Sequence, residues 1–359
     1  MRILQLIDSL GIGGAERMCV NIANVLHEDG YEVYLCATRA GGPLERFIDK
    51  DVNYFVLNKR SSLDILAFRK FIQIIRSNKI DVIHAHSSSL FWAVAAKFFF
   101  RNLKVIWHDH LGVRIRDRKK NPFYRLLSVK IDAVISVNDE LADWSRKNMK
   151  VSDERIQFLN NFPLLTTLPH HPDPDYFTIV CLANIRPQKD HATLIKAIGI
   201  LAERKLPKKL QVILAGSYDE DEYFNELRTL VQSMGLKEII EFRGQVEDTA
   251  TLLASADCGV LSSVSEGLPV SLLEYGMAGL PVVVTDVGQC AEVVDTGKFG
   301  RIVPPGDADV LANELFWIIQ NRDSALQMGD TFRKHVNNEY GPVQFMRQYY
   351  SLLDKIIER

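Results

Sequence analysis

The stretch CGVLSSVSEGLPVSLLEYGMAGLPVVVTD, residues 258–286, decides the fold. Two short β-branched runs enclose a segment with the apolar spacing of a helix, and a proline stands near the start of that segment, where its missing amide proton is not needed. A strand, a helix and a strand in this order make a unit whose two strands run parallel. The same alternation fills the chain, so the sequence predicts an α/β protein with parallel sheets.

Two series of such units are expected. Strand-like runs of the first series are RILQLI (2–7), EVYLCAT (32–38), NYFVLN (53–58), DVIHAH (81–86), KVIWHDH (104–110) and DAVISV (132–137). Those of the second series are FTIVCLANI (177–185), QVILAGS (211–217), IIEFRGQV (239–246), CGVLSS (258–263) and PVVVTD (281–286). Residues 160–176 hold four prolines and read as a linker. We therefore expect doubly wound domains at 1–165 and 166–340, facing across a ligand-binding cleft, and an amphipathic helix at 341–359.

Composition excludes some classes of protein. With 359 residues and 47% hydrophobic side chains, the chain has ample material for two cores. A net charge of -2 gives no electrostatic case for nucleic acid as the main partner. No signal segment is recognised at the start, and no C-x-x-C pair occurs, so we expect reduced, buried thiols in the cytoplasm: Cys19, Cys36, Cys181, Cys258 and Cys290.

Two stretches raise the question of a membrane. SLFWAVAAKFFF, residues 89–100, is strongly apolar, but Lys97 interrupts it and it is too short to cross a bilayer. We expect a core helix there, with a face turned to a membrane as the alternative. RDRKKNPFYR, residues 116–125, is expected to be a solvated loop, with contact to a membrane or an anionic acceptor as the alternative.

Glycines follow the first predicted strand, in DSLGIGGAER, residues 8–17. Gly13 and Gly14 permit positive φ and close backbone approach, and a helix from about Ala15 would turn its amino end toward an anion. A plain tight turn explains them equally well. Glu16 stands where a dinucleotide fingerprint needs its third glycine, which argues against an NAD-dependent dehydrogenase.

A second charged loop lies in ANIRPQKDHATLIKAI, residues 183–198. Asp190 is suited to cap the following helix, and Arg186 and Lys189 precede the helix amino end. Two cations and a helix dipole favour a phosphate at this point, although a solvated charged loop is the alternative.

The opening stretch places two carboxylates around a helix start. Pro269 suits the first turn of a helix, Glu266 precedes that helix, and Glu274 lies inside it. Carboxylates accept hydrogen bonds from sugar or ribose hydroxyls, and helix-start amides bind phosphate oxygens. The pattern fits a nucleotide sugar, bound by the amides of Gly267, Leu268 and Val270.

Four histidines end two strands of the first series: His84, His86, His108 and His110. A metal site that includes the adjacent Asp109, a hydrogen-bonding or acid/base histidine, and satisfied structural histidines remain open interpretations. Two acidic pairs resemble the metal-binding motif of another class of sugar transferases, but helix capping explains them better: Asp219 with Asp221, and Asp307 with Asp309.

Taken together, DSLGIGGAER, ANIRPQKDHATLIKA, FRGQVED and EGLPVSLLEYGMAGLPVVVTDVGQCAEVV resemble the family 4 retaining glycosyltransferases (glycosyl transferases group 1), which have the GT-B fold. The resemblance covers nearly the whole chain and is strongest from Phe177 to Pro305. It implies two Rossmann-like domains, with the acceptor bound mainly by the first and the donor by the second. The final helix would cross back onto the first domain.

The resemblance also implies roles for single residues. Glu266 would contact the donor sugar, Glu274 the ribose hydroxyls, and the backbone of Gly267, Leu268, Pro269 and Val270 the sugar and phosphates. The Gly13 and Gly14 loop would approach the diphosphate, and the base would meet the backbone near Val246 in FRGQVED, so UDP and GDP donors are not distinguished.

One part of the family pattern is displaced. Lys189 falls in place, but the expected arginine position holds Asn184, and Arg186 follows two residues later. The family's cleft histidine aligns with His110, with His108 as the competitor. Front-face attack with retention is expected, without a metal ion or other cofactor, and Glu266 as a covalent nucleophile is the alternative.

The resulting expectation is a cytoplasmic hexosyltransferase-like enzyme, at the inner face of a membrane, that glycosylates a saccharide or lipid-linked acceptor during surface polysaccharide, lipopolysaccharide or glycolipid synthesis. The alternatives are a nucleotide-sugar epimerase or hydrolase of the same fold, and a non-catalytic nucleotide-sugar-binding partner of a membrane assembly complex.

Overall fold

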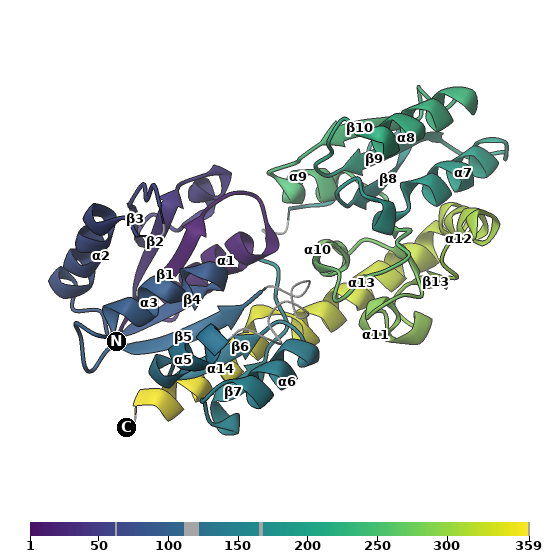
Figure 1. Cartoon of the computed structure of the whole chain (residues 1–359). Helices are drawn as coiled ribbons and strands as arrows, with labels where there is room; N and C mark the ends of the chain where they lie inside the picture. Colours follow the sequence, from purple (N-terminus) through teal and green to yellow (C-terminus); the bar gives the residue numbers. More distant parts are fainter. Residues whose placement is uncertain (62, 111–121, 165–167, 358–359) are drawn as a thin grey trace. The chain divides into compact units, whose positions relative to one another are not determined.

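The computed structural model describes residues 1–61, 63–110, 122–164 and 168–357. The chain forms two compact units (Figure 1). Unit 1 consists of Met1–Pro163 together with Pro342–Arg359, and unit 2 of Leu164–Gly341. Each unit is built around one parallel sheet, which confirms the predicted α/β class.

Unit 1 has a seven-stranded parallel sheet in the order β3-β2-β1-β4-β5-β6-β7. Its strands are β1 (Arg2–Ser9), β2 (Glu32–Ala40), β3 (Asn53–Val56), β4 (Val82–His86), β5 (Lys104–Asp109), β6 (Ala133–Ser136) and β7 (Ile156–Phe158). The first six match the predicted runs. β7 was not predicted, because a three-residue edge strand carries too few residues to show a period.

Helices cover both faces of this sheet. They are α1 (Gly14–Glu28), α2 (Ile65–Ser77), α3 (Leu90–Ala96), α5 (Pro122–Leu127), α6 (Asp139–Asn148) and α14 (Pro342–Ile357), with short 3₁₀ turns η1 (Pro43–Phe47), η2 (Ser87–Ser89), η4 (Ser128–Lys130) and η5 (Asp153–Arg155). Leu4 and Trp107 of the sheet share a core with side chains of α2, α3 and α6. Alternate strand residues face the other way, where His84 stacks on Tyr349 of α14.

Unit 2 has a six-stranded parallel sheet in the order β10-β9-β8-β11-β12-β13. Its strands are β8 (Tyr176–Leu182), β9 (Lys209–Ala215), β10 (Ile240–Gly244), β11 (Cys258–Leu261), β12 (Val282–Thr285) and β13 (Arg301–Val303). Its helices are α7 (His191–Ala202), α8 (Glu222–Ser233), α9 (Thr249–Ala254), α10 (Val270–Ala278), α11 (Cys290–Val293), α12 (Ala308–Gln320) and α13 (Arg322–Glu339), with turns η6 (Pro187–Lys189) and η7 (Asp295–Gly297).

The stretch 258–286 folds as β11, α10 and β12, as predicted. One detail differs, because Pro269 caps α10 from outside with an extended backbone (φ −77°, ψ 106°) and does not lie in its first turn. Both acidic pairs contribute caps, since Asp221 accepts from the Phe224 amide and Asp307 from the Val310 amide. All five cysteines are buried and free, as expected for the side chains themselves.

The apolar stretch 89–100 is only partly a core helix. Trp92 of α3 is buried, as expected, but Phe98 and Phe99 beyond the helix are 72% and 60% exposed. Of the basic run 116–125, residues 116–121 lie outside the described residues. None of the described helices combines the length and the apolarity that a bilayer crossing needs.

Candidate functional site

In both sheets the strand order reverses next to the first strand of the unit, between β1 and β4 and between β8 and β11. Loops that leave neighbouring strands in opposite directions open a crevice at the carboxyl ends of those strands, where ligands of such sheets bind. The predicted charged loops of unit 2 follow β8 and β11, so they meet at its reversal point.

Two hydrogen bonds join these loops. The Val264 amide donates to the Gln188 carbonyl oxygen at 2.9 Å, and Ser262 Oγ donates to the Lys189 carbonyl oxygen at 3.0 Å. The loop after β8 and the loop after β11 therefore form one continuous surface.

Lys189 and Glu266 form an ion pair on this surface. Lys189 Nζ lies 2.6 Å from Glu266 Oε1 and 2.8 Å from Oε2. Ser263 Oγ donates a further hydrogen bond of 2.6 Å to Glu266 Oε1. The Glu266 side chain is 7% exposed and that of Lys189 is 26% exposed, so the lysine is the more accessible partner. Two predicted site residues, 77 positions apart, are thus in direct contact.

Free backbone donors lie beside this pair. Within the described chain, the amides of Gly267, Leu268 and Val270 make no hydrogen bond, as expected for a loop that enters a helix. Glu274 is half-buried one turn into α10. The region therefore offers amide donors, a cation and two carboxylates, which suits a ligand with phosphates and hydroxyls.

A third loop, which follows β12, supports the loop after β11, although none of its residues was predicted as a site residue. Gln289 donates its amide proton to the Gly267 carbonyl oxygen at 3.0 Å. Gly288 has φ +54°, and a Cβ atom there would lie 2.3 Å from the Glu266 carbonyl oxygen. Only glycine allows this approach without displacing Glu266. In the sequence, the only indication of this loop is the stretch GQC, residues 288–290, shortly after the predicted strand PVVVTD.

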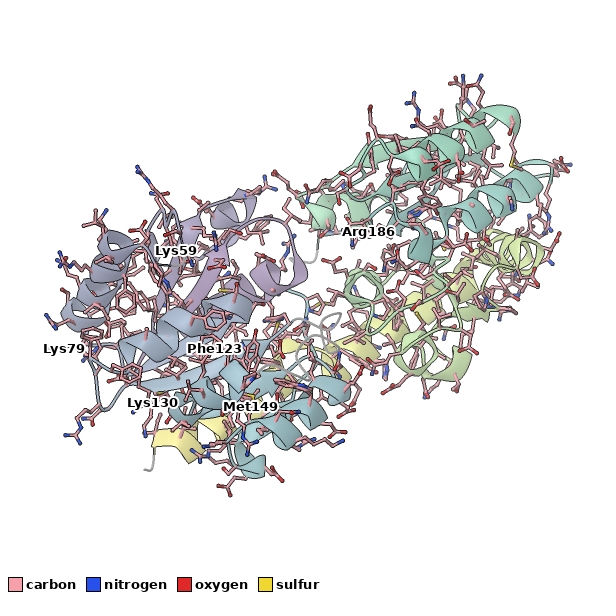
Figure 2. The ribbon with its side chains drawn as sticks, in the orientation of Figure 1. Lys59, Lys79, Phe123, Lys130, Met149 and Arg186 are labelled. Carbon is pink, nitrogen blue, oxygen red and sulfur yellow. The ribbon has the colours of Figure 1, made fainter. Side chains whose placement is uncertain are left out.

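The remaining predicted residues of unit 2 lie in neighbouring loops. Arg186 is exposed at the start of η6 and makes no ion pair with the described residues (Figure 2). Asn184 accepts a hydrogen bond of 3.0 Å from the Ser217 amide and so joins the loops after β8 and β9. Val246 is half-buried in the loop after β10. Asp190 caps α7 through the Thr193 amide, as predicted.

The glycine loop of unit 1 differs from its prediction. Gly13 has an extended backbone (φ −157°, ψ 164°) and α1 begins at Gly14, so neither glycine uses positive φ. A Cβ atom on Gly13 would instead lie 2.3 Å from Glu16 Oε2, because the Glu16 side chain folds over the loop. Burial raises the pKa of Glu16.

Asp8, at the end of β1, was not predicted as a site residue. It accepts hydrogen bonds from Thr38 Oγ1 (2.6 Å), Ser88 Oγ (2.7 Å) and Lys59 Nζ (3.0 Å). Burial opposes ionisation of this carboxyl, but the three hydrogen bonds outweigh that effect and lower the pKa of Asp8. The residue thus links the end of β1 to β2, to η2 after β4 and to the segment after β3, beside the glycine loop.

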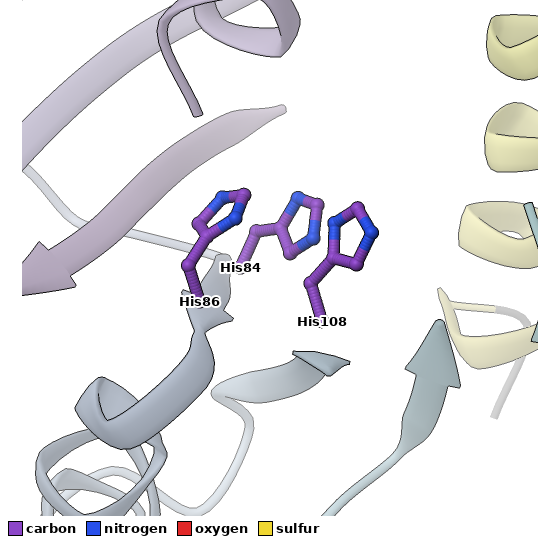
Figure 3. Close-up of side chains that lie close together, drawn as sticks. All are labelled: His84, His86 and His108. Atoms are coloured by element: carbon purple, nitrogen blue, oxygen red, sulfur yellow. The ribbon is translucent and has the colours of Figure 1, made fainter. Parts of the chain in front are cut away.

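The four histidines gather on the face of the unit 1 sheet that α14 covers. Ring nitrogens of His84, His86 and His108 lie within 4.8 Å of one another (Figure 3). His110 continues the row, with its ring centroid 3.9 Å from that of His108. His108 is fully buried and His110 is half-buried at the end of β5, so His110 is the more accessible of the two predicted competitors.

A directed hydrogen-bond chain ends at His110. Gln5 Oε1 lies 2.9 Å from His86 Nε2, and an amide oxygen only accepts, so this nitrogen carries the proton. His86 Nδ1 is then an acceptor, and His110 Nε2, 3.0 Å away, donates to it. His110 Nδ1 is itself buried, has no hydrogen-bond partner among the described residues, and is left with a lone pair. Gln5 and His86 thus set the tautomer of His110.

Burial keeps these imidazoles neutral. It lowers the pKa of His84 and of His110 to about 3. It also holds the pKa of His86 and of His108 well below the usual value, and the neighbouring histidines lower these two pKa values further. Neutral imidazoles are suitable metal ligands. However, His86 already uses both ring nitrogens, so a metal ion at this cluster would require one of its hydrogen bonds to break.

Comparison with known proteins gives two adjoining family matches. Residues 12–162 match the model described as Glycosyltransferase Family 4, and residues 169–335 match Glycosyl transferases group 1. The chain is 20% identical to the N-acetyl-alpha-D-glucosaminyl L-malate synthase of Bacillus anthracis, over 95% of this chain and 93% of that protein. It is 22% identical to a UDP-Gal:alpha-D-GlcNAc-diphosphoundecaprenol alpha-1,3-galactosyltransferase of Escherichia coli, over 91% and 90%.

A solved structure has the same fold. The Anabaena protein Alr3699/HepE, crystallised with UDP and glucose, superposes with a TM-score of 0.75 over 99% of both chains at 20% sequence identity. At this identity the superposition shows the fold alone.

Proposed function

Because the chain belongs to the group 1, family 4 glycosyltransferases with the GT-B fold, we propose that it moves a sugar from a nucleotide-diphosphate sugar to a saccharide or lipid-linked acceptor with retention of configuration at the anomeric carbon. The observation that carries this proposal is the Lys189–Glu266 ion pair beside the free amides of Gly267, Leu268 and Val270.

The donor diphosphate competes for Lys189. Phosphate oxygens accept hydrogen bonds from the free amides and from Lys189 Nζ, and Arg186 supplies a second cation from the preceding turn. Glu266, released from Lys189, then accepts hydrogen bonds from hydroxyls of the donor sugar. Donor binding is thus coupled to the exchange of one ion pair for another.

The nucleoside is bound further along the same loops. Glu274 accepts hydrogen bonds from the ribose hydroxyls, and the backbone around Val246 contacts the base. The Gly13–Gly14 loop of unit 1 is also assigned to diphosphate binding, which requires the Glu16 side chain to move away from Gly13.

The chemical step breaks the bond between the anomeric carbon and the diphosphate oxygen. A new bond to the acceptor oxygen forms on the same face, and the acceptor proton passes to the leaving phosphate. Developing negative charge on the diphosphate is stabilised by helix-start amides and by Lys189 and Arg186, without a metal ion. His110 Nδ1 accepts a hydrogen bond from a different hydroxyl of the acceptor and so orients the attacking one, whose proton goes to the phosphate, with Gln5 and His86 as positioning residues.

One relative supports the proposed acceptor class. The name of the E. coli relative includes a diphosphoundecaprenol acceptor, which supports a lipid-linked acceptor here and a role in polysaccharide or glycolipid synthesis. Such acceptors are amphiphiles that stay in a membrane, so the enzyme works in the cytoplasm at the inner membrane face.

A thermal-shift screen tests the proposal. Purified protein is heated with UDP, GDP, ADP and CMP and with their common sugar conjugates. A ligand at 100 times its Kd stabilises the native state by about 2.7 kcal/mol, so one base should raise the melting temperature by several degrees. Incubation with the matching conjugate alone then separates transfer from epimerisation or hydrolysis by product analysis. Absence of a shift with every nucleotide would overturn the proposal.

A further inference from the structure

Unit 1 exposes many large apolar side chains on and beside the helices that cover one face of its sheet. Leu63 is 88% exposed, Phe98 72% and Leu126 70%. Exposed apolar groups of this size are rare in clusters unless another surface covers them. The apolar face, as we name it, consists of Leu63, Ile65, Leu66, Phe98, Phe99, Phe123, Leu126 and Val129.

Side-chain contacts show that these segments adjoin. Phe99 lies 6.0 Å from Phe68 of α2 between ring centroids, and Lys130 Nζ lies 5.4 Å from the Phe98 ring. Phe123 of α5 lies 5.3 Å from Phe91 of α3. Figure 2 marks Phe123 and Lys130 on unit 1, and Figure 1 shows α2, α3 and α5 along the same side of the sheet. The apolar face is therefore one surface.

The same segments are basic. Three cations lie in α2, three in residues 97–104 and two in residues 122–130, and these segments contain no acidic residue. Asp64, which caps α2 between Leu63 and Ile65 of the apolar face, contributes one negative charge, and the surface stays net positive. The whole chain has a net charge of -2, so positive charge is concentrated here. Lys97 is paired with Asp132, whereas the other seven have no acidic residue in their own segment: Arg69, Lys70, Arg76, Arg101, Lys104, Arg125 and Lys130.

We propose that the apolar face docks unit 1 on the surface of an anionic lipid membrane, where its phenylalanine and leucine side chains enter the headgroup boundary and its lysines and arginines contact lipid phosphates. Apolar insertion combined with basic flanks is the physical signature of interfacial membrane binding. Two copies of this face would bring like charges together, which disfavours a self-associating dimer. The inference deepens the proposed function, on which its biological purpose rests.

Vesicle flotation tests the docking of the full chain. Wild-type protein should float with vesicles of phosphatidylcholine and phosphatidylglycerol, float at least tenfold less with phosphatidylcholine alone, and lose most binding in high salt, since exposed charges are screened. The double variant Phe98→Ser/Phe99→Ser and the charge reversal Arg125→Glu/Lys130→Glu should each reduce binding at least tenfold. Failure of the wild type to float with anionic vesicles would overturn the inference.

Matched controls keep the result interpretable. Val343→Ser removes a side chain of similar exposure (66%) from α14, and Lys237→Glu reverses an exposed charge in unit 2; both should bind like wild type. Leu63→Ser/Leu66→Ser provides an independent reduction if the phenylalanine variant lowers the melting temperature. Binding unchanged in all face variants would overturn the inference, as would a dimer that these substitutions dissociate in sedimentation.

The nucleotide screen distinguishes the two proposals. Protein that binds a nucleotide but no vesicle retains its proposed function and loses the docking inference. Protein that binds anionic vesicles but no nucleotide supports docking and contradicts the proposed function, because flotation requires neither donor nor turnover.

Discussion

Lys189 Nζ bonds to both carboxylate oxygens of Glu266, at 2.6 and 2.8 Å, across 77 residues of sequence. A cation proposed for the diphosphate thus neutralises a carboxylate proposed for the sugar while no donor is bound. The pair keeps both side chains in place, and Lys189 compensates the negative charge of the mostly buried Glu266.

Lys189→Met should therefore have two effects. Turnover should fall by about 10²–10³-fold, because the leaving diphosphate loses a charge-stabilising group. Unfolding free energy should fall by about 1–3 kcal/mol, because Glu266 loses its partner. Lys189→Met/Glu266→Gln should recover stability in urea denaturation but not activity. If the double variant is no more stable than the single one, the ion pair does not stabilise the fold.

Glu274→Ala should weaken nucleotide binding by about 10- to 100-fold while leaving the fold intact, since hydrogen bonds to a charged acceptor contribute about 1.5–3 kcal/mol. Calorimetric titration with the nucleotide and its 2′,3′-dideoxy analogue checks the cause. Wild type should prefer the ribose form, and the variant should bind the two alike. A preference that persists in the variant would exclude the ribose contact.

His110→Ala should reduce turnover by about 10²-fold while leaving the nucleotide Kd unchanged, because its free Nδ1 is proposed to hold the acceptor and not the donor. Gln5→Leu should give a smaller loss of turnover, since it removes the acceptor that fixes the His86 tautomer. Initial rates at saturating donor check both. A turnover loss confined to His108→Ala, with the fold intact, would assign the role to His108.

Stability should fall in mild acid. The pKa values of His84 and His110 are lowered to about 3, and those of His86 and His108 are also lowered, so unfolded chains bind protons that the native state excludes. The stability of the native state is therefore highest above about pH 6.5, where the histidines are neutral in both states. Below that pH the free energy of unfolding falls by about 1.4 kcal/mol per histidine and pH unit, toward pH 3. Urea denaturation between pH 7.5 and 5 measures the slope, and His108→Leu should reduce it by one proton.

Chelation should leave activity unchanged. Phosphate charge is proposed to be met by amides and side chains alone, so dialysis against EDTA should not alter initial rates. Elemental analysis of the untreated protein is the matching control. A complete loss that zinc or manganese restores would contradict the proposal and point to His84, His86 and His108, and variants of these residues would then show reduced metal content.

Sequence patterns located most of the scaffold because each central strand is a short β-branched run that ends at a polar loop. The strand–helix–strand unit at 258–286 lies where its apolar spacing placed it. The edge strands β7 and β13 escaped prediction because three residues cannot show a period. Gly13 and Gly14 do not use the positive φ that glycine permits, since glycine at a loop is equally compatible with an extended backbone.

Relationships between distant segments were not predictable in the same way. The pairing of Lys189 with Glu266 depends on β8 and β11 being neighbours in the sheet. Hydrophobic periodicity locates single strands but does not reveal the order of the strands in a sheet. The dependence of His110 on Gln5 and His86 likewise requires β1, β4 and β5 to adjoin. Exposure of Phe98 and Phe99 follows from the end of α3 at Ala96, whereas the apolar run continues to Phe100.

The contact between Tyr349 and His84, with 3.2 Å between Oη and Nδ1, joins residues 265 positions apart. At about 5–20 residues per second, a ribosome needs on the order of 15 to 50 s to make the intervening chain. During that interval the histidine face of unit 1 lacks its covering helix, whereas unit 2 is continuous in sequence and is complete before α14 emerges. Biosynthesis thus finishes the second unit before the first, and a ribosome that stalls after residue 341 leaves the core beneath α14 open.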